Sequence, residues 1–97
     1  SGTVGDAAFG LQHLGHPLKQ RLDYPTPRCE LGQLLKGLAH SMIDISDGLA
    51  QDLGHILKAS QLGAVLNLNQ LPISPALKCL PEAQQWQYAL AGGDDYE

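Results

Sequence analysis

The sequence predicts an α/β or α+β layer in which helices pack on a mixed sheet. Apolar residues recur at helical spacing in three segments, and two short apolar runs between them are typical of buried strands. The predicted order is therefore helix, strand, helix, strand, helix, which indicates helices on a sheet. Two strands are too few for a stable sheet, so we expect further strands elsewhere in a parent protein or in a partner.

The first 40 residues predict a short helix, an irregular connection and a longer helix. Asp6 can cap a helix that runs to Leu14 and ends at Gly15. Three prolines make residues 16–28 an irregular connection. Leucines at helical spacing then predict an amphipathic helix over 29–40.

The second half predicts both strands and the other helices. Residues 42–45 indicate a short buried strand, and the helical period returns over 48–60. The partial alternation of residues 64–68 predicts a second strand. Ser-Pro at 74–75 is a favoured helix start, and a last helix is predicted over 81–91.

The composition fits one modest globular domain and argues against two classes of function. Of the 97 residues, 43% are hydrophobic and 16% charged. Six Lys+Arg stand against ten Asp+Glu, a net charge of −4, and the lack of a basic run argues against nucleic-acid binding. No apolar stretch approaches the ~20 residues of a membrane span. Cys29 and Cys79 are too few for a disulfide framework, which favours reduced thiols in a cytoplasmic protein.

The densest group of chemically capable side chains is Asp44-Ile45-Ser46-Asp47-Gly48. It joins a predicted strand to a predicted helix, whose free N–H groups would suit phosphate oxygens. Carboxylates on such a turn suit Mg²⁺ that carries a nucleotide phosphate. The alternative is that Asp47 or Ser46 only caps the helix, a contribution of about 1 kcal/mol. Capping leaves Asp44 unexplained, because a carboxylate in an apolar strand carries a desolvation cost.

A second acidic segment follows two glycines: Gly92-Gly93-Asp94-Asp95-Tyr96-Glu97. Glycines followed by acids can form a turn that holds carboxylates near a ligand, although a solvated acidic loop is the commoner explanation of such a run. His13 and His16 are three residues apart and could lie on one helix face. A zinc site needs further ligands, and only Cys29 or the distant Cys79, His40 and His55 could supply them, which argues against such a site.

Four segments carry a family resemblance. They are Gly2-Thr3-Val4-Gly5-Asp6-Ala7-Ala8, Pro25-Thr26-Pro27-Arg28, residues 43–60 and residues 92–97. On these segments the chain resembles, along essentially its whole length, the thiamine-monophosphate kinase family, within the wider group that includes aminoimidazole ribonucleotide synthetase. The resemblance implies part of an aminoimidazole ribonucleotide synthetase C-terminal-like domain.

The resemblance also implies an ATP-dependent kinase that converts thiamine monophosphate to thiamine diphosphate. Such an enzyme chiefly positions two anions and neutralises them with Mg²⁺, because one phosphate attacks another. The family pattern implies that Asp44 and Asp47 are Mg²⁺ ligands and that Ser46 contacts ATP. No nucleophile–base arrangement stands out, so no catalytic residue is assigned.

On the substrate side, Asp94 aligns with a family glutamate that contacts the thiamine phosphate. Its side chain is shorter by one methylene, so we expect a longer or water-mediated contact. Asp95 is assigned to the same substrate side by adjacency alone. Tyr96 and Glu97 match the motif and receive no role.

The resemblance finally implies a larger, homodimeric enzyme. Residues 1–97 match only the first section of the C-terminal domain, as one partial domain, and the family's Asp-rich N-terminal domain for Mg²⁺ and ATP is absent. We therefore expect no kinase activity from these 97 residues alone. Two alternatives are another ATP-using synthetase of the wider group, against which the 92–97 segment argues, and a non-catalytic nucleotide-binding or interaction module.

Overall fold

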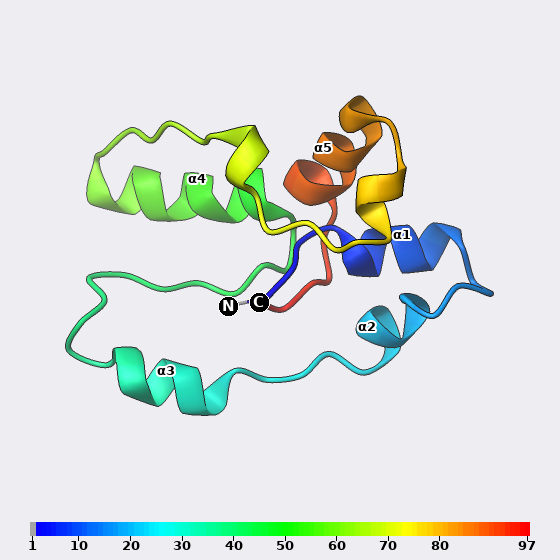
Figure 1. The fold of residues 1–97 in the computed structure, drawn as a ribbon. Helices are drawn as coiled ribbons and strands as arrows, with labels where there is room; N and C mark the ends of the chain where they lie inside the picture. The colour runs from blue at the N-terminus through cyan, green and yellow to red at the C-terminus, as the bar shows by residue number, and fades with distance from the viewer. Residues whose placement is uncertain (1) are drawn as a thin grey trace.

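The computed structural model describes residues 2–97, and the regular elements in them are all helical (Figure 1). In chain order they are α1 Asp6–Gln12, α2 Lys19–Asp23, α3 Cys29–Leu35, α4 Leu49–Ser60, the 3₁₀-helices η1 Leu68–Gln70 and η2 Leu77–Cys79, and α5 Glu82–Ala91. Within the described residues, none of these helices has the length and hydropathy that a bilayer crossing requires.

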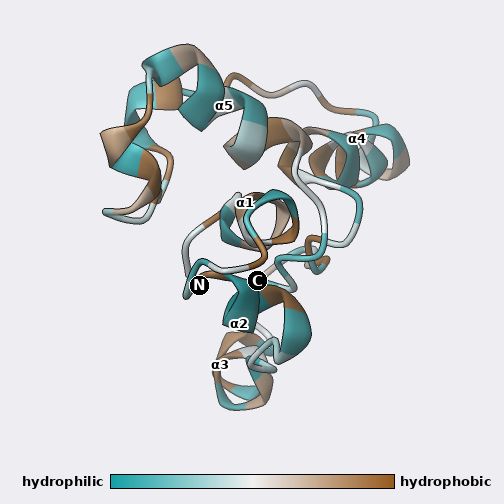
Figure 2. Ribbon diagram, turned by 90° about the vertical axis from the view of Figure 1, so that its right-hand side faces the viewer, coloured by the Kyte–Doolittle hydropathy of each residue, from teal (hydrophilic) through white to brown (hydrophobic). Residues whose placement is uncertain are grey.

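Helix α1 lies at the centre of the molecule. It contacts α2 on one side and α5 on the other, and α5 also packs on α4 (Figure 2). The buried hydrophobic core is formed by Val4, Phe9, Ile45, Ile73, Leu77 and Ala89. The ring of Phe9 meets the ring of Tyr88 edge-on, with centroids 5.4 Å apart, and so joins α1 to α5. Helix α3 has no buried residue and stands apart from this core (Figure 1).

The two longest helices confirm the predictions made from apolar spacing. α4 and α5 fall within one residue of the predicted ranges 48–60 and 81–91. Helix α3 begins at the predicted residue but ends at Leu35, five residues early. Gly37 follows with φ 85°, in the left-handed region that favours glycine and breaks a right-handed helix.

The first 28 residues contain one more helix than predicted. α1 begins at Asp6, which was expected to be its cap, and ends two residues early, at Gln12; the N-cap residue is Gly5. Helix α2 lies inside the connection that was predicted to be irregular, because a single helical turn fits between Pro17 and Pro25. Further on, the predicted start at Ser74 gives only a short 3₁₀ turn, with the Ser74 hydroxyl accepting the Leu77 N–H at 3.3 Å.

The predicted fold class is wrong, because residues 2–97 contain no strand and no sheet on which helices could pack. Both predicted strands, 42–45 and 64–68, are mainly irregular chain, and Val65 is 97% exposed. The N–H groups of Asp94 and Tyr96 donate to the carbonyls of Ser46 and Ile45, at 2.9 Å each. Such single bonds do not make a β-ladder. Apolar alternation shows which side chains favour burial, but it does not supply a partner strand.

Candidate functional site

The turn from Asp44 to Gly48 is held by a buried carboxylate that sequence reasoning missed. Asp52, in the first turn of α4, is 2% exposed. One of its oxygens, Oδ2, accepts the backbone N–H groups of Ser46, Asp47 and Gly48 at 2.9, 3.0 and 3.2 Å. Asp52 therefore ties the turn to its helix, and neither Ser46 nor Asp47 caps α4 through its side chain.

This arrangement changes what the turn can offer a ligand. The N–H groups of Ser46, Asp47 and Gly48 are already bonded to Asp52, so these three are not available to phosphate oxygens. The carboxylates of Asp44 and Asp47 are exposed, and Ser46 is half-buried. The only side-chain partner of Asp47 within residues 2–97 is the Gln51 amide, which donates at 3.1 Å. The turn can thus present carboxylate oxygens to a cation.

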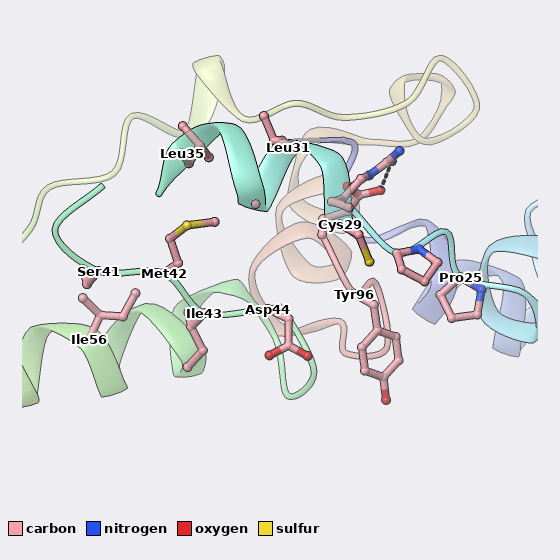
Figure 3. Close-up of a pocket in the computed structure, with 14 residues that line it drawn as sticks. Pro25, Cys29, Leu31, Leu35, Ser41, Met42, Ile43, Asp44, Ile56 and Tyr96 are labelled. Atoms are coloured by element: carbon pink, nitrogen blue, oxygen red, sulfur yellow. Dashed lines mark hydrogen bonds and ion pairs between the residues drawn. The ribbon is translucent and has the colours of Figure 1, made fainter. Parts of the chain in front are cut away.

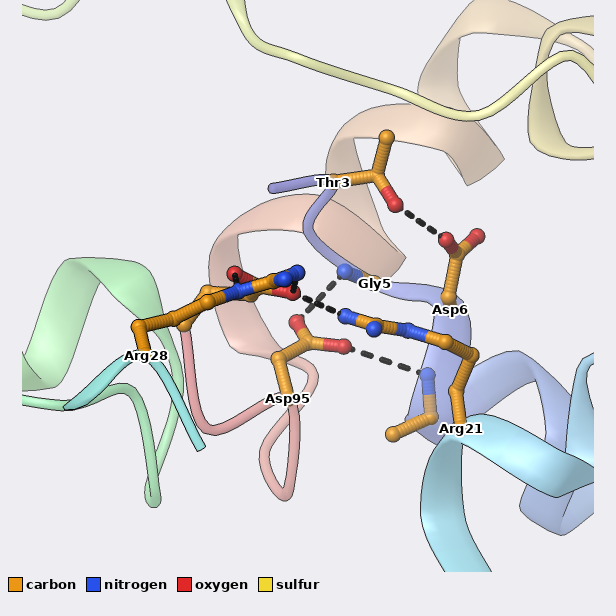
Figure 4. Close-up of polar contacts among 8 residues, drawn as sticks. Thr3, Gly5, Asp6, Arg21, Arg28 and Asp95 are labelled. Carbon is orange, nitrogen blue, oxygen red and sulfur yellow. Dashed lines mark hydrogen bonds and ion pairs between the residues drawn. The ribbon is translucent and has the colours of Figure 1, made fainter. Parts of the chain in front are cut away.

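The second acidic segment folds back onto the N-terminus of α1. The carboxylate of Asp95 is 1% exposed and accepts the Gly5 N–H at 2.6 Å and the Ala7 N–H at 3.1 Å (Figure 4). Asp95 therefore caps α1, although it lies 90 and 88 positions after Gly5 and Ala7 in the sequence. Asp6, the expected cap, instead accepts a hydrogen bond from the Thr3 hydroxyl. Burial raises the pKa of Asp95, and the two N–H bonds oppose that rise.

Glycines let the sequence motifs approach one another closely. A Cβ on Gly93 would lie 2.5 Å from the Ser46 carbonyl oxygen, so no side chain fits between the two acidic motifs. Gly5 has φ 88°, and a Cβ there would lie 2.8 Å from the carbonyl carbon of Tyr88. Beside them, half-buried Asp94 has φ 64°, a left-handed conformation that aspartate tolerates better than most residues. The segments from the two ends of the chain and the central turn therefore form one unit.

Glu97 joins the second motif segment, Pro25–Arg28, to this unit. Arg28 donates to both of its oxygens, from Nε at 2.8 Å and from Nη2 at 2.5 Å, and Arg21 of α2 also donates to it (Figure 4). The side chain of Glu97 is only 3% exposed. The hydrogen bond from Arg28, assisted by the charges of both guanidiniums, lowers the pKa of Glu97 to about 2. No single-residue signal in the sequence pointed to this pairing across 69 positions.

We predict that acid weakens the fold through Glu97. Its folded pKa of about 2 lies below the ordinary value of 4.5, so its stabilising contribution is complete above pH 4.5 and is lost as the pH falls towards 2. Urea unfolding between pH 2 and 6 measures this. The difference in free energy of unfolding between the wild type and Glu97→Gln should shrink across that window. A constant difference would show that the ion pairs contribute nothing.

A groove of about 880 Å³ opens beside the turn (Figure 3). Its lining is mostly apolar and comes from α3 and the 41–44 segment, with Leu31 and Met42 among it. The side chains of Asp44 and Tyr96 extend to the same side of the groove, and Glu97 also lines it. Its volume is in the range of ligand pockets. Of the predicted site residues, only Asp44 lies on this groove; Ser46, Asp47, Asp94 and Asp95 do not line it.

The residues 10–92 match a known family, AIR synthase related protein, C-terminal domain. The chain belongs to this family. The matched part of this AIR synthase related domain includes the Asp44–Gly48 turn and its anchor Asp52. Gly5 and the acidic residues after Gly93 lie outside it. The expectation that the chain comes from the aminoimidazole ribonucleotide synthetase group is thereby confirmed.

The AIR synthase related domain is also similar to thiamine-monophosphate kinases along its whole length. The enzyme of Haemophilus influenzae is 49% identical over 108 residues, covering 100% of this chain and 33% of the enzyme. That of Escherichia coli K12 is 47% identical, with 100% and 34% covered. The crystal structure of the enzyme from Stenotrophomonas maltophilia K279a has a TM-score of 0.90 and 42% identity, covering 99% of this chain and 35% of that one. The chain spans about a third of each relative, and the resemblance to this kinase family is confirmed.

Proposed function

We propose that this chain forms part of the C-terminal domain of a thiamine-monophosphate kinase, an enzyme that transfers a phosphoryl group from ATP to thiamine monophosphate. The observation that carries the proposal is the similarity to such kinases over every segment of the chain, in sequence and in fold. The convergence of the four motif segments in one unit supports it, because residues far apart in the sequence would be assembled for one task.

The chain would contribute to phosphoryl transfer by positioning a Mg²⁺ ion and the phosphate groups of ATP. Asp44 and Asp47 would bind Mg²⁺, which neutralises phosphate oxygens when it is bound. Their donor chemistry fits, since both are exposed carboxylates on a turn that Asp52 fixes. The Ser46 hydroxyl would donate a hydrogen bond to a phosphate oxygen of ATP.

The acidic segment would face the second substrate through Asp94. Asp94 is half-buried, and its backbone N–H is tied to the carbonyl of Ser46, so the substrate side and the nucleotide side are joined directly. Asp95 was also assigned to the substrate. Its burial and its two N–H bonds favour a positioning role instead, in which it holds the segment that carries Asp94.

The wider features of the enzyme belong to the same proposal. Residues 1–97 form one partial domain of a homodimeric parent that has no nucleic-acid partner. The parent is cytoplasmic, and the unpaired, exposed thiols of Cys29 and Cys79 support this location. Neither a synthetase of the wider group nor a non-catalytic module gains support, because the named relatives reported above are kinases.

A chimera tests the proposal. In the Escherichia coli kinase, this 97-residue chain replaces the matching third of the enzyme, and formation of thiamine diphosphate from ATP and thiamine monophosphate is measured. We expect an active chimera and no product from the 97 residues alone. Asp44→Asn in the chimera should lower kcat about a hundredfold, because a ligand for the charge-neutralising ion is weakened. Asp23→Asn, an exposed carboxylate on α2, is the matched control and should change little.

A folded chimera without activity would contradict the proposed function. Circular dichroism and size-exclusion chromatography establish whether the chimera is folded. Equal loss of activity in Asp44→Asn and in the control would remove Asp44 from the site while leaving the kinase assignment in place.

A further inference from the structure

Tyr96 stands between two anchored carboxylates. Asp95 is 1% exposed and accepts two backbone N–H groups, and the side chain of Glu97 is 3% exposed and accepts from two arginines. The N–H of Tyr96 itself donates to the Ile45 carbonyl at 2.9 Å. Although its backbone and both neighbours are held in this way, Tyr96 is 39% exposed and takes no part in the hydrophobic core.

The backbone of Tyr96 adopts an unfavourable conformation. Its φ is 51°, in the left-handed region, which is costly for any L-residue and unusual for a bulky one. Packing of the core does not explain this conformation, because the ring contributes nothing to the core. Strained residues of this kind persist where their surroundings fix them, and they are concentrated at ligand sites. The strain at Tyr96 therefore directs attention to what its ring meets.

The ring of Tyr96 lines the groove of about 880 Å³, on the same side as Asp44 (Figure 3). Most of the remaining lining is apolar, with Leu31 and Met42 among it. The Tyr96 hydroxyl reaches beyond the groove to Oδ1 of Asp94, at 3.4 Å. The apolar lining and the acidic side chains therefore meet at this ring.

We propose that Tyr96 binds the thiazolium ring of thiamine monophosphate, face to face, in this groove. The thiazolium is a flat cation, which the face of a tyrosine ring attracts and which nearby carboxylates attract further. A short ethyl arm joins this ring to the phosphate. The inference rests on the proposed function, which puts the phosphate groups at the Asp44–Asp47 turn, so the ring closest to the phosphate lies next to Tyr96.

Kinetics of the chimeric kinase test this inference. Tyr96→Leu removes the aromatic face but keeps an apolar side chain that carries the same backbone cost. We expect the KM for thiamine monophosphate to rise about tenfold, while kcat and the KM for ATP change less than about twofold. Tyr96→Phe keeps the ring, so its KM should stay within about twofold of the wild type. Tyr24→Leu changes an exposed tyrosine outside the groove and should leave all three constants as they are.

The outcomes separate this inference from the proposed function. An active chimera in which Tyr96→Leu leaves the KM for thiamine monophosphate unchanged would overturn the inference and keep the kinase assignment. Unfolding of Tyr96→Leu, seen by circular dichroism, would also overturn it, because the ring would then serve the fold. So would an equal rise in KM for ATP, or an equal rise in Tyr96→Phe. A folded chimera that forms no product would remove the proposed function and this inference together.

Discussion

Replacing Gly5 with alanine should lower the free energy of unfolding by about 3 kcal/mol. Two effects add. Gly5 has φ 88°, and a left-handed conformation costs an L-residue about 1–2 kcal/mol. A Cβ would also lie 2.8 Å from the Tyr88 carbonyl carbon and 2.9 Å from the Ala89 nitrogen, and such overpacking costs about 1–3 kcal/mol. The neighbouring atoms belong to the backbone of α5, which cannot move aside as a flexible side chain would.

Thermal and urea unfolding of the 97-residue chain measure this effect. Gly54→Ala is the matched control, since Gly54 lies inside α4 with no atom within 4 Å of an added Cβ. That change should stabilise the chain by up to about 1 kcal/mol, through helix propensity alone. If Gly5→Ala were as stable as the wild type, the close contact of α1 with α5 would be wrong.

Replacing Asp95 with alanine should also destabilise the chain by about 3 kcal/mol. The N–H groups of Gly5 and Ala7 would lose their acceptor in a buried position, and each unsatisfied group costs about 1–3 kcal/mol. Helix α1 would lose its cap at the same time. The effect is large because α1 lies at the centre of the fold, in contact with α2 and α5.

The same unfolding experiments check Asp95→Ala against Asp23→Ala. Asp23 forms an i,i+4 ion pair with Lys19 on α2, and both side chains are over a third exposed. Removing such a pair costs about 0.5 kcal/mol at most. Similar losses in the two variants would show that Asp95 does not cap α1.

The sequence predicted most reliably what depends on near neighbours. α4 and α5 follow from apolar spacing over 10 or more residues, and their ends agree with the structure within a residue. The acidic turn at 44–48 was also found, since its carboxylates and glycine are adjacent in the sequence. Such features need no knowledge of where the rest of the chain goes.

What the sequence could not predict depends on residues that are distant in the chain. Residues 42–45 are apolar enough for a strand, yet no partner strand exists within 2–97. The sequence favoured a solvated acidic loop for Asp95 and Glu97. In the structure both side chains are buried, and their partners Ala7 and Arg28 lie 88 and 69 positions away in the sequence. Asp52 was passed over as one polar residue on an amphipathic helix. Its role depends on the exact path of the turn before it.

The central claim is that fully buried carboxylates such as Asp95 hold the site, while more exposed ones such as Asp94 act in it. Asp94→Asn and Asp95→Asn, each made in the chimeric kinase, test this most directly through unfolding and kcat/KM for thiamine monophosphate. Asparagine tolerates the left-handed backbone of Asp94, so that variant should keep its Tm and lose about tenfold in kcat/KM. Asp95→Asn should unfold at a lower temperature and keep the kcat/KM of each folded molecule. A lower Tm with normal kcat/KM in Asp94→Asn, together with a normal Tm and reduced kcat/KM in Asp95→Asn, would contradict this claim.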